Sequence, residues 1–125
     1  MSGDRFGFDS DSTIVGEPSA LSVPGAAKRP ACLELVQGPG APREFALVGE
    51  ETVIGRSTQA TICLESLLLS RRHVALRRSG PELRLVDLQS ANGVYLNGVR
   101  IHSAGLFDGD TIQIGDVLLV YREGG

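Results

Sequence analysis

Short apolar runs, interrupted every few residues by turn-forming residues, dominate the chain from Ala31 onward. Several runs alternate, as in ELRLVD, where Leu83 and Leu85 face one side of a strand and the charged residues face the other. The runs expected to form strands are CLELV, EFALV, TVIG, TICL, HVALRR, ELRLVDL, VYLN, TIQIG and VLLVY. Because no stretch keeps a helical period, the pattern predicts an all-β protein, a sandwich or a small barrel.

Gly, Pro and Asn mark the turns between these runs. GPGAP (38–42) and SGPE (79–82) each separate two runs, and Asn97-Gly98 lies between alternating apolar residues in YLNGVRI. Asn-Gly is a strong hairpin signal, because both central residues of a type I′ turn need a positive φ. In a sandwich the loops at one end come together, so residues far apart in the sequence can share one surface.

Residues 1–30 differ in composition from the rest, with Asp, Ser, Gly and Pro dominating. Such a segment buries too little apolar surface to offset its ordering entropy, which predicts a flexible tail before one folded domain at 31–125. Thr13 follows acidic residues in DSDSTIVGE and is a candidate phosphorylation site. A plain solubilising tail is the alternative.

The net charge of −3 argues against a nucleic-acid-binding protein, which would usually be basic. Of the 12 Lys and Arg residues all but Lys28 are arginine, the better ligand for phosphate and carboxylate groups. No apolar run is long enough to cross a bilayer, and the N-terminus lacks a signal pattern. We therefore expect a cytoplasmic protein with no membrane partner.

Four clusters of residues contain groups that could do chemistry. They are Gly55-Arg56, Ser70-Arg71-Arg72-His73, Ser90-Ala91-Asn92-Gly93 and Asn97-Gly98. Most lie where strands should end, and loops on a rigid scaffold often hold binding residues. An enzyme site, an anion-binding loop and a plain structural role are the three alternatives.

The enzyme alternative would use Ser70 as nucleophile and His73 as base, with an acid from Asp87, Asp108 or Asp110. In an extended strand, residues three apart point to opposite faces, which would separate Ser70 from His73. No nucleophile elbow is present, and the two histidines and two cysteines lack the paired spacing of zinc ligands. We expect no catalysis, no metal and no cofactor.

The anion-binding alternative uses the same loop differently. Arg56 follows Gly55, where the backbone can turn sharply, and supplies a guanidinium. Ser70 would offer its hydroxyl and its own N–H, and Arg71 a second guanidinium. Burial of residues 67–69, three leucines, would anchor this loop beneath the donors.

The ordered set G-R (55, 56), S-x-x-H (70–73), S-x-N-G (90–93) and N-G (97, 98) resembles the forkhead-associated (FHA) domain family. The resemblance covers roughly residues 31–123. It implies a β-sandwich of about eleven mostly antiparallel strands that binds phosphothreonine in partner peptides.

By this resemblance, Arg56 and Ser70 would hold the phosphate, and Arg71 would add a further phosphate or peptide contact. Asn92 would hydrogen-bond the peptide backbone beside the phosphothreonine. The remaining matched positions would be structural, with His73 tying loops together and Gly55, Gly93, Asn97 and Gly98 shaping them.

Two positions depart from the family pattern. Ala91 stands where the family commonly has threonine, so a hydroxyl is lost and affinity or residue preference is expected to weaken. Leu68 stands where some members have a charged residue that reads the third position after the phosphothreonine, which predicts no preference for an acidic residue there. Arg72 either is solvated or widens the positive rim.

The resemblance implies a phosphothreonine-binding adaptor or regulator in Ser/Thr-kinase signalling, and we expect a monomer. Its partners would be a phosphothreonine-containing protein and a Ser/Thr protein kinase. Some family members bind their own phosphorylated tail, so modification of Thr13 could close the domain on itself. A phosphate-independent interaction or structural module is the alternative that Ala91 keeps open.

Overall fold

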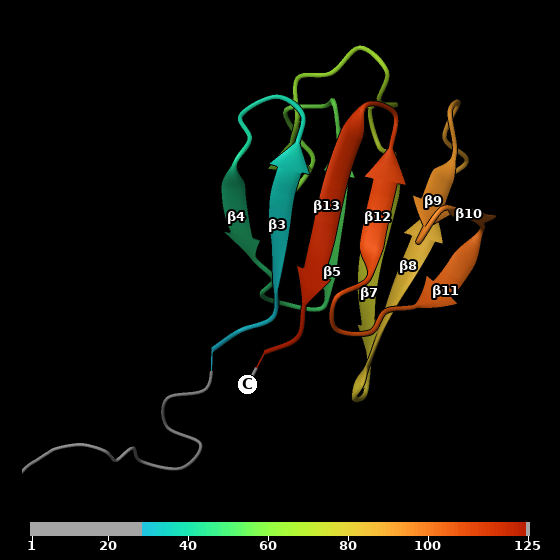
Figure 1. Cartoon of the computed structure of the whole chain (residues 1–125). Helices are drawn as coiled ribbons and strands as arrows, with labels where there is room; N and C mark the ends of the chain where they lie inside the picture. The colour runs from blue at the N-terminus through green and yellow to red at the C-terminus, as the bar shows by residue number, and fades with distance from the viewer. Residues whose placement is uncertain (1–28, 125) are drawn as a thin grey trace, which may run out of the picture. The chain divides into compact units, whose positions relative to one another are not determined.

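The computed structural model describes residues 29–124, which contain eleven strands and no helix. The strands, labelled as in Figure 1, are β3 (Cys32–Gln37), β4 (Arg43–Ala46), β5 (Glu51–Gly55), β6 (Ile62–Cys63), β7 (Val74–Ser79), β8 (Glu82–Asp87), β9 (Val94–Leu96), β10 (Val99–Ile101), β11 (Ser103–Gly105), β12 (Thr111–Ile114) and β13 (Val117–Arg122). The tail expected at 1–30, with Thr13, lies almost wholly outside the described residues.

Two sheets face each other. The six-stranded sheet has the order β10-β9-β12-β13-β3-β4 and the five-stranded sheet the order β11-β8-β7-β5-β6. Only the pairing of β5 with β6 is parallel among the described strands. The predicted mostly antiparallel β-sandwich is therefore confirmed.

Every expected run contains a strand, and β11 is the one strand that the sequence did not indicate. Its residues, Ser-Ala-Gly, offer no large apolar side chain, and it forms by pairing with β8 through Ala104 and Leu85. The predicted hairpin turn between β9 and β10 is confirmed, because Asn97 and Gly98 have φ values of 51° and 86°.

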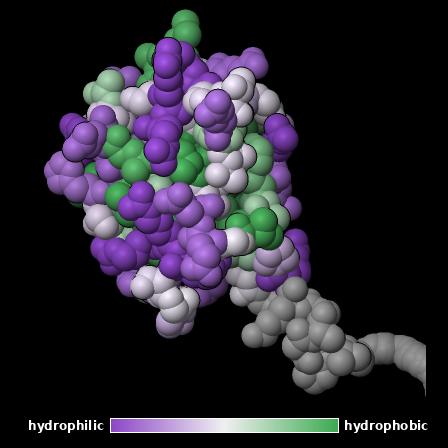
Figure 2. All heavy atoms as spheres, turned by 180° about the vertical axis from the view of Figure 1, so that it is seen from behind, coloured by the Kyte–Doolittle hydropathy of each residue, from purple (hydrophilic) through white to green (hydrophobic). Residues whose placement is uncertain are grey.

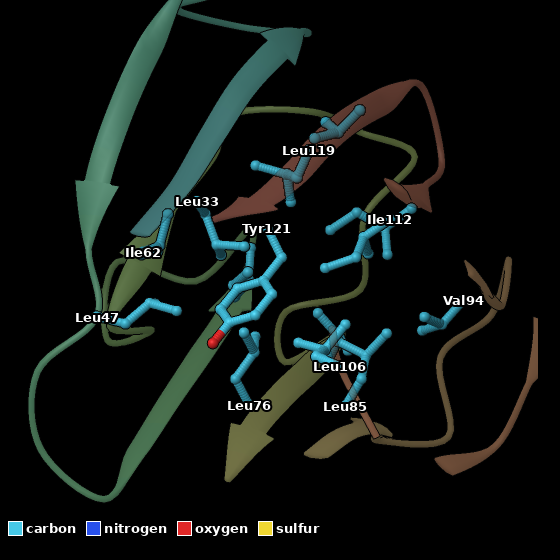
Figure 3. Packing of buried hydrophobic residues seen from close by; sticks show 14 of the residues in the cluster. Leu33, Leu47, Ile62, Leu76, Leu85, Val94, Leu106, Ile112, Leu119 and Tyr121 are labelled. Atoms are coloured by element: carbon cyan, nitrogen blue, oxygen red, sulfur yellow. The ribbon is translucent and has the colours of Figure 1, made fainter. Parts of the chain in front are cut away.

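Alternating residues of both sheets meet in one apolar core. Leu33 and Leu119 from the six-stranded sheet face Leu76 and Leu85 from the five-stranded sheet (Figure 3). All four are essentially fully buried, and each such side chain contributes about 1.5–3 kcal/mol of transfer free energy. This core makes the sandwich a rigid base for its loops.

The connections 56–73 and 88–93 lie at the same end of the sandwich, the upper end in Figure 1. The backbone N–H of Arg56 donates to the Ser70 carbonyl (3.0 Å), and the N–H of Ser57 donates to the Arg71 carbonyl (3.1 Å). The N–H of Ala91 donates to the Ser70 Oγ (3.0 Å). These bonds bring three of the four predicted clusters together.

Among residues 29–124, no helix has the length and apolar character needed to cross a membrane. Cys32 and Cys63 form no disulfide. Both cysteines are half-buried.

Candidate functional site

Ser70 lies at the centre of the candidate site, fixed by hydrogen bonds to Arg56, His73 and Ala91. Its carbonyl accepts from Arg56, and its Oγ accepts from the Ala91 N–H. A hydroxyl that accepts one bond still has its proton to donate. The Ser70 N–H, expected to bind an anion, instead donates to Nδ1 of His73 (3.0 Å), so that part of the prediction is wrong. Of the two Ser70 donors, only the hydroxyl proton remains available to a ligand.

Arg56 follows the last residue of β5 and has an exposed side chain. Its Nε donates to the Leu69 carbonyl (3.1 Å), which orients the guanidinium and leaves the Nη groups available. The preceding Gly55 is the last residue of β5 and lacks a positive φ, so its backbone conformation does not by itself require glycine. Glycine is required there because a Cβ would lie 2.0 Å from the Arg71 carbonyl oxygen.

His73 is fully buried, and all its polar groups have partners. Its N–H donates to Ile54 and its carbonyl accepts from Leu88. Since Nδ1 accepts from Ser70, the ring proton is assigned to Nε2, which donates to the Gly93 carbonyl (2.8 Å). The neutral imidazole therefore ties the serine loop to the 88–93 loop, as expected of a structural residue.

The leucine run before Ser70 is only partly buried. Leu69 is 2% exposed and anchors the loop, whereas Leu67 is 91% and Leu68 49% exposed. The expectation that all three leucines bury their side chains is wrong. Residues 66–69 form a tight turn, closed by a bond from the Leu69 N–H to the Ser66 carbonyl, and a turn cannot aim three successive side chains at one core.

Asn92 is exposed at the rim of the site. Its Nδ2 donates to the Leu68 carbonyl (2.7 Å), which assigns the orientation of the amide. The other N–H and the Oδ1 have no partner among the described residues. The loop before it is held by the Asp87 carboxylate, which accepts from Ser90, and by the Ser90 Oγ, which accepts from Gly93 (φ 83°).

The fourth predicted cluster lies apart from the first three. The Asn97 side chain donates to Asp110 (3.0 Å) and accepts from the Thr111 N–H (2.9 Å). Asn97 and Gly98 thus shape the β9–β10 hairpin and link it to the start of β12. No hydrogen bond within 29–124 joins them to Ser70 or Asn92.

The arginines of the described residues divide into two groups. Three form ion pairs with carboxylates, namely Arg77–Glu51 (2.7 Å), Arg84–Glu82 (3.3 Å) and Arg122–Glu34 (3.3 Å). The first two pairs lie on the outer side of the five-stranded sheet, a face largely covered by hydrophilic side chains (Figure 2).

The arginines beside the Ser70 loop have no carboxylate partner in the described part of the chain. They are Arg56, Arg71 and Arg72. The carboxylate of Glu51, at the start of the strand that precedes Arg56, pairs with Arg77 instead. Three guanidiniums without an ion pair therefore flank the Ser70 loop, although the net charge of the protein is negative.

The geometry does not support the enzyme alternative. Ser70 meets His73 through its backbone N–H, and its hydroxyl oxygen instead accepts from Ala91. The three candidate acids each accept from a backbone N–H elsewhere, Asp87 from Ser90, Asp108 from Glu123 and Asp110 from Phe107. No cluster of three His, Cys, Asp or Glu suited to a metal ion is found in 29–124.

Sequence reasoning missed three residues near the site. Arg100, on the edge strand β10, lies against Gly93. A Cβ added at Gly93 would be 2.7 Å from the Arg100 Nε. Ser66 is the first residue of the turn at 66–69, here called the leucine turn, and is hydrogen-bonded to Asp116. No signal links Ser66 to Asp116, which are 50 positions apart, but Arg100 follows the recognised Asn-Gly turn by two residues.

A family model for the FHA domain matches residues 52–115. The chain is 38% identical over 108 residues to an oxoglutarate dehydrogenase inhibitor of Corynebacterium jeikeium (86% of this chain, 75% of that one). It is 35% identical over 117 residues to the glycogen accumulation regulator GarA of Mycolicibacterium smegmatis (94% and 74%). A solved structure from an analysis of phosphothreonine-dependent FHA domain interactions matches with a TM-score of 0.68 and 33% identity (74% and 94%).

Proposed function

This chain belongs to the FHA domain family, and we propose that its loop end binds phosphothreonine peptides, which makes it a regulator in Ser/Thr-kinase signalling. The observation that carries this proposal is the Ser70 hydroxyl, held with its proton free between loops whose guanidiniums lack carboxylate partners. Phosphate, with close to two negative charges and three acceptor oxygens, suits such a group of donors.

Four donors are available for the phosphate. They are the Nη groups of Arg56, the O–H of Ser70, and the guanidinium and backbone N–H of Arg71, which has no acceptor among the described residues. Each hydrogen bond to a charged group contributes about 1.5–3 kcal/mol. Two or three of them with backbone contacts give about −8 kcal/mol, a micromolar affinity.

Asn92 supplies the contact to the peptide backbone. Its remaining N–H and Oδ1 match the carbonyl and N–H that an extended peptide offers. The neighbouring Ala91 contributes its backbone N–H to Ser70 irrespective of its side chain. The missing threonine hydroxyl therefore weakens side-chain contacts with the ligand and leaves the position of Ser70 unchanged.

The rim next to Asn92 is apolar. The exposed side chains of Leu67 and Leu68 carry no charge to attract a carboxylate. A peptide whose third residue after the phosphothreonine is apolar should bind better than one with an acidic residue at that position. Arg72, on the other side of Ser70, is exposed and widens the positive rim.

The two relatives are named as an inhibitor of oxoglutarate dehydrogenase and a regulator of glycogen accumulation. These names support a regulatory, non-catalytic role for this chain. Its partners would then be a phosphothreonine-containing protein and the Ser/Thr kinase that modifies it. The chain would act in the cytoplasm as a monomer.

Phosphorylation of Thr13 would switch this function. The modified residue, preceded by acidic positions, would occupy the site on its own chain and exclude other ligands. Phosphorylating the full chain with a Ser/Thr kinase and recording amide chemical shifts tests this step. Shifts at Ser70 and Asn92 are expected, and their absence eliminates the closure.

Matched peptide libraries test the binding itself. One library has a fixed phosphothreonine and the other a fixed threonine, and both are titrated into the unphosphorylated chain by calorimetry. We expect micromolar affinity for the first and at least about a hundredfold weaker binding of the second. Equal affinity for the two libraries overturns the proposal and favours the phosphate-independent interaction module.

A further inference from the structure

We propose that Ser66 and Asp116 are positioning residues for peptide binding, because they hold the Asn92 amide in place through Leu68. This inference rests on the proposed function. It adds two residues that neither contact the phosphate donors nor belong to the family motif. The connection runs through three hydrogen bonds in series.

The first link joins Ser66 to the β12–β13 turn. Ser66 is 4% exposed, and its Oγ donates to the Asp116 Oδ1 at 2.5 Å, the short distance typical of hydrogen bonds to a carboxylate. This bond uses the only proton of the hydroxyl. The Ser66 Oγ is therefore fixed as an acceptor toward the leucine turn.

The second and third links act on Leu68. Its N–H donates to the Ser66 Oγ (3.2 Å), and its carbonyl accepts from the Asn92 Nδ2 (2.7 Å). The Leu68 side chain is half-exposed, so burial alone does not hold this residue. Hydrogen bonds at both of its backbone groups hold it instead.

Gly115 brings the turn close enough for this arrangement. It has a φ of 57°, and a Cβ there would lie 3.0 Å from the Leu68 Cβ. The β12–β13 turn thus packs directly beneath the leucine turn. The turn that contains Asp116 joins β12 to β13, and the four paired positions of these strands give it a rigid base.

Fixing an exposed side chain before the ligand arrives removes an entropic cost of binding. Asn92 is exposed, and its side chain makes one hydrogen bond within residues 29–124, to the Leu68 carbonyl. If Leu68 moves, the amide regains its rotamers and must be ordered by the peptide. The loss expected from one such side chain is about three- to tenfold in affinity.

A double-mutant cycle in the full chain tests the link. Ser66→Ala and, separately, Asp116→Ala are measured by calorimetry with the phosphothreonine peptide library, alone and combined with Asn92→Ala. Each is expected to weaken binding about three- to tenfold in the wild-type background and to have no further effect when Asn92 is absent. If the losses of affinity add to that of Asn92→Ala, the inference is overturned.

Ser103→Ala is the matched control. Its hydroxyl also bonds a side chain, the Arg84 guanidinium, but lies on β11, and binding should be unchanged. Inorganic phosphate, followed by chemical shifts at Ser70, should bind Ser66→Ala and the wild type equally, because phosphate offers no peptide backbone for Asn92 to contact. An equal loss for phosphate and peptide overturns the positioning role.

Failure of this inference differs from failure of the proposed function. If the wild type binds no phosphopeptide, the proposed function fails first. If the wild type binds while Ser66→Ala and Asp116→Ala bind equally well, only the positioning role is lost. The Asn92 side-chain resonances give an independent readout, and they should shift in both variants. If Ser66→Ala unfolds, Asp116→Ala still tests the link, because Asp116 lies at an exposed turn.

Discussion

The backbone N–H of Ser70 donates a hydrogen bond of 3.0 Å to the Nδ1 of His73, three residues later in the chain. The other ring nitrogen of His73 donates to the carbonyl of Gly93, next to Asn92. One buried imidazole therefore sets the separation between the serine of the proposed phosphate site and the asparagine of the proposed backbone site. Its role is to hold the two loops at a fixed distance.

His73→Ala should destabilise the fold more than it weakens recognition. The change leaves the Ser70 N–H and the Gly93 carbonyl without partners and creates a cavity, at a cost of roughly 2–5 kcal/mol in the free energy of unfolding. Urea denaturation measures this cost. His102→Ala, at an exposed position, is the control and should be nearly neutral. A His73 variant with full stability but no binding would reverse the assignment.

Arg56→Ala should reduce phosphopeptide affinity at least about tenfold while the fold survives. The guanidinium is exposed and makes one hydrogen bond, to the Leu69 carbonyl, so its removal costs the structure little. Calorimetric titration with the phosphothreonine library measures the effect. Arg77→Ala removes an arginine that already pairs with Glu51, and its binding should match the wild type. Unchanged affinity for Arg56→Ala would remove this residue from the site.

Gly55→Ala should be strongly destabilising. A methyl group 2.0 Å from the Arg71 carbonyl oxygen forces the Ser70 loop away from β5, which breaks the bond from Arg56 to Ser70. We expect a loss above about 3 kcal/mol in the free energy of unfolding. Gly40→Ala, with a positive φ but no atom nearby, should cost only about 1 kcal/mol. Equal melting temperatures for the two variants would contradict the close-approach explanation.

Arg100→Ala should weaken phosphopeptide binding about two- to fivefold and reduce its salt dependence. The guanidinium lies against Gly93 with no carboxylate partner among the described residues, so its charge is available to an anionic ligand. Titrations at two salt concentrations measure both effects. Arg122→Ala is the control, because that residue pairs with Glu34. An identical salt dependence in the two variants would exclude Arg100 from the rim.

Much of the fold followed from local pattern. Alternation in runs such as 82–87 predicts strands because side chains on a pleated strand alternate between faces, and the Asn97-Gly98 turn follows from its need for positive φ. The strand Ser103–Gly105 was missed, because small residues contain no such pattern and pairing with β8 alone defines it.

Less of the candidate site than of the fold could be predicted from the sequence. The motif predicted that Arg56, Ser70 and Asn92 share one end, and the structure brings their loops together. The motif could not say which donors are already in use, because that depends on turns such as 66–69. The bond from Ser66 to Asp116 joins positions that only the packing of two loops brings together.

Tyr121→Phe should make the protein more resistant to alkali. Burial raises the pKa of the Tyr121 phenol, and the charge of Glu123 raises that pKa further, so the folded state holds the phenolic proton more tightly than the unfolded state does. Unfolded tyrosine loses its proton near pH 10. The contribution of this group to stability is complete below that pH and is lost as the pH rises through the folded pKa.

The decrease in the free energy of unfolding should therefore begin above about pH 10 in the wild type and be smaller in Tyr121→Phe. The Tyr121 hydroxyl has no hydrogen-bond partner in the described part of the chain, so the two proteins should unfold at similar urea concentrations at neutral pH. Urea midpoints at pH 7 and above pH 10 measure both expectations. Because other groups titrate equally in the two proteins, the difference between them isolates Tyr121, and equal alkaline losses would contradict the assignment.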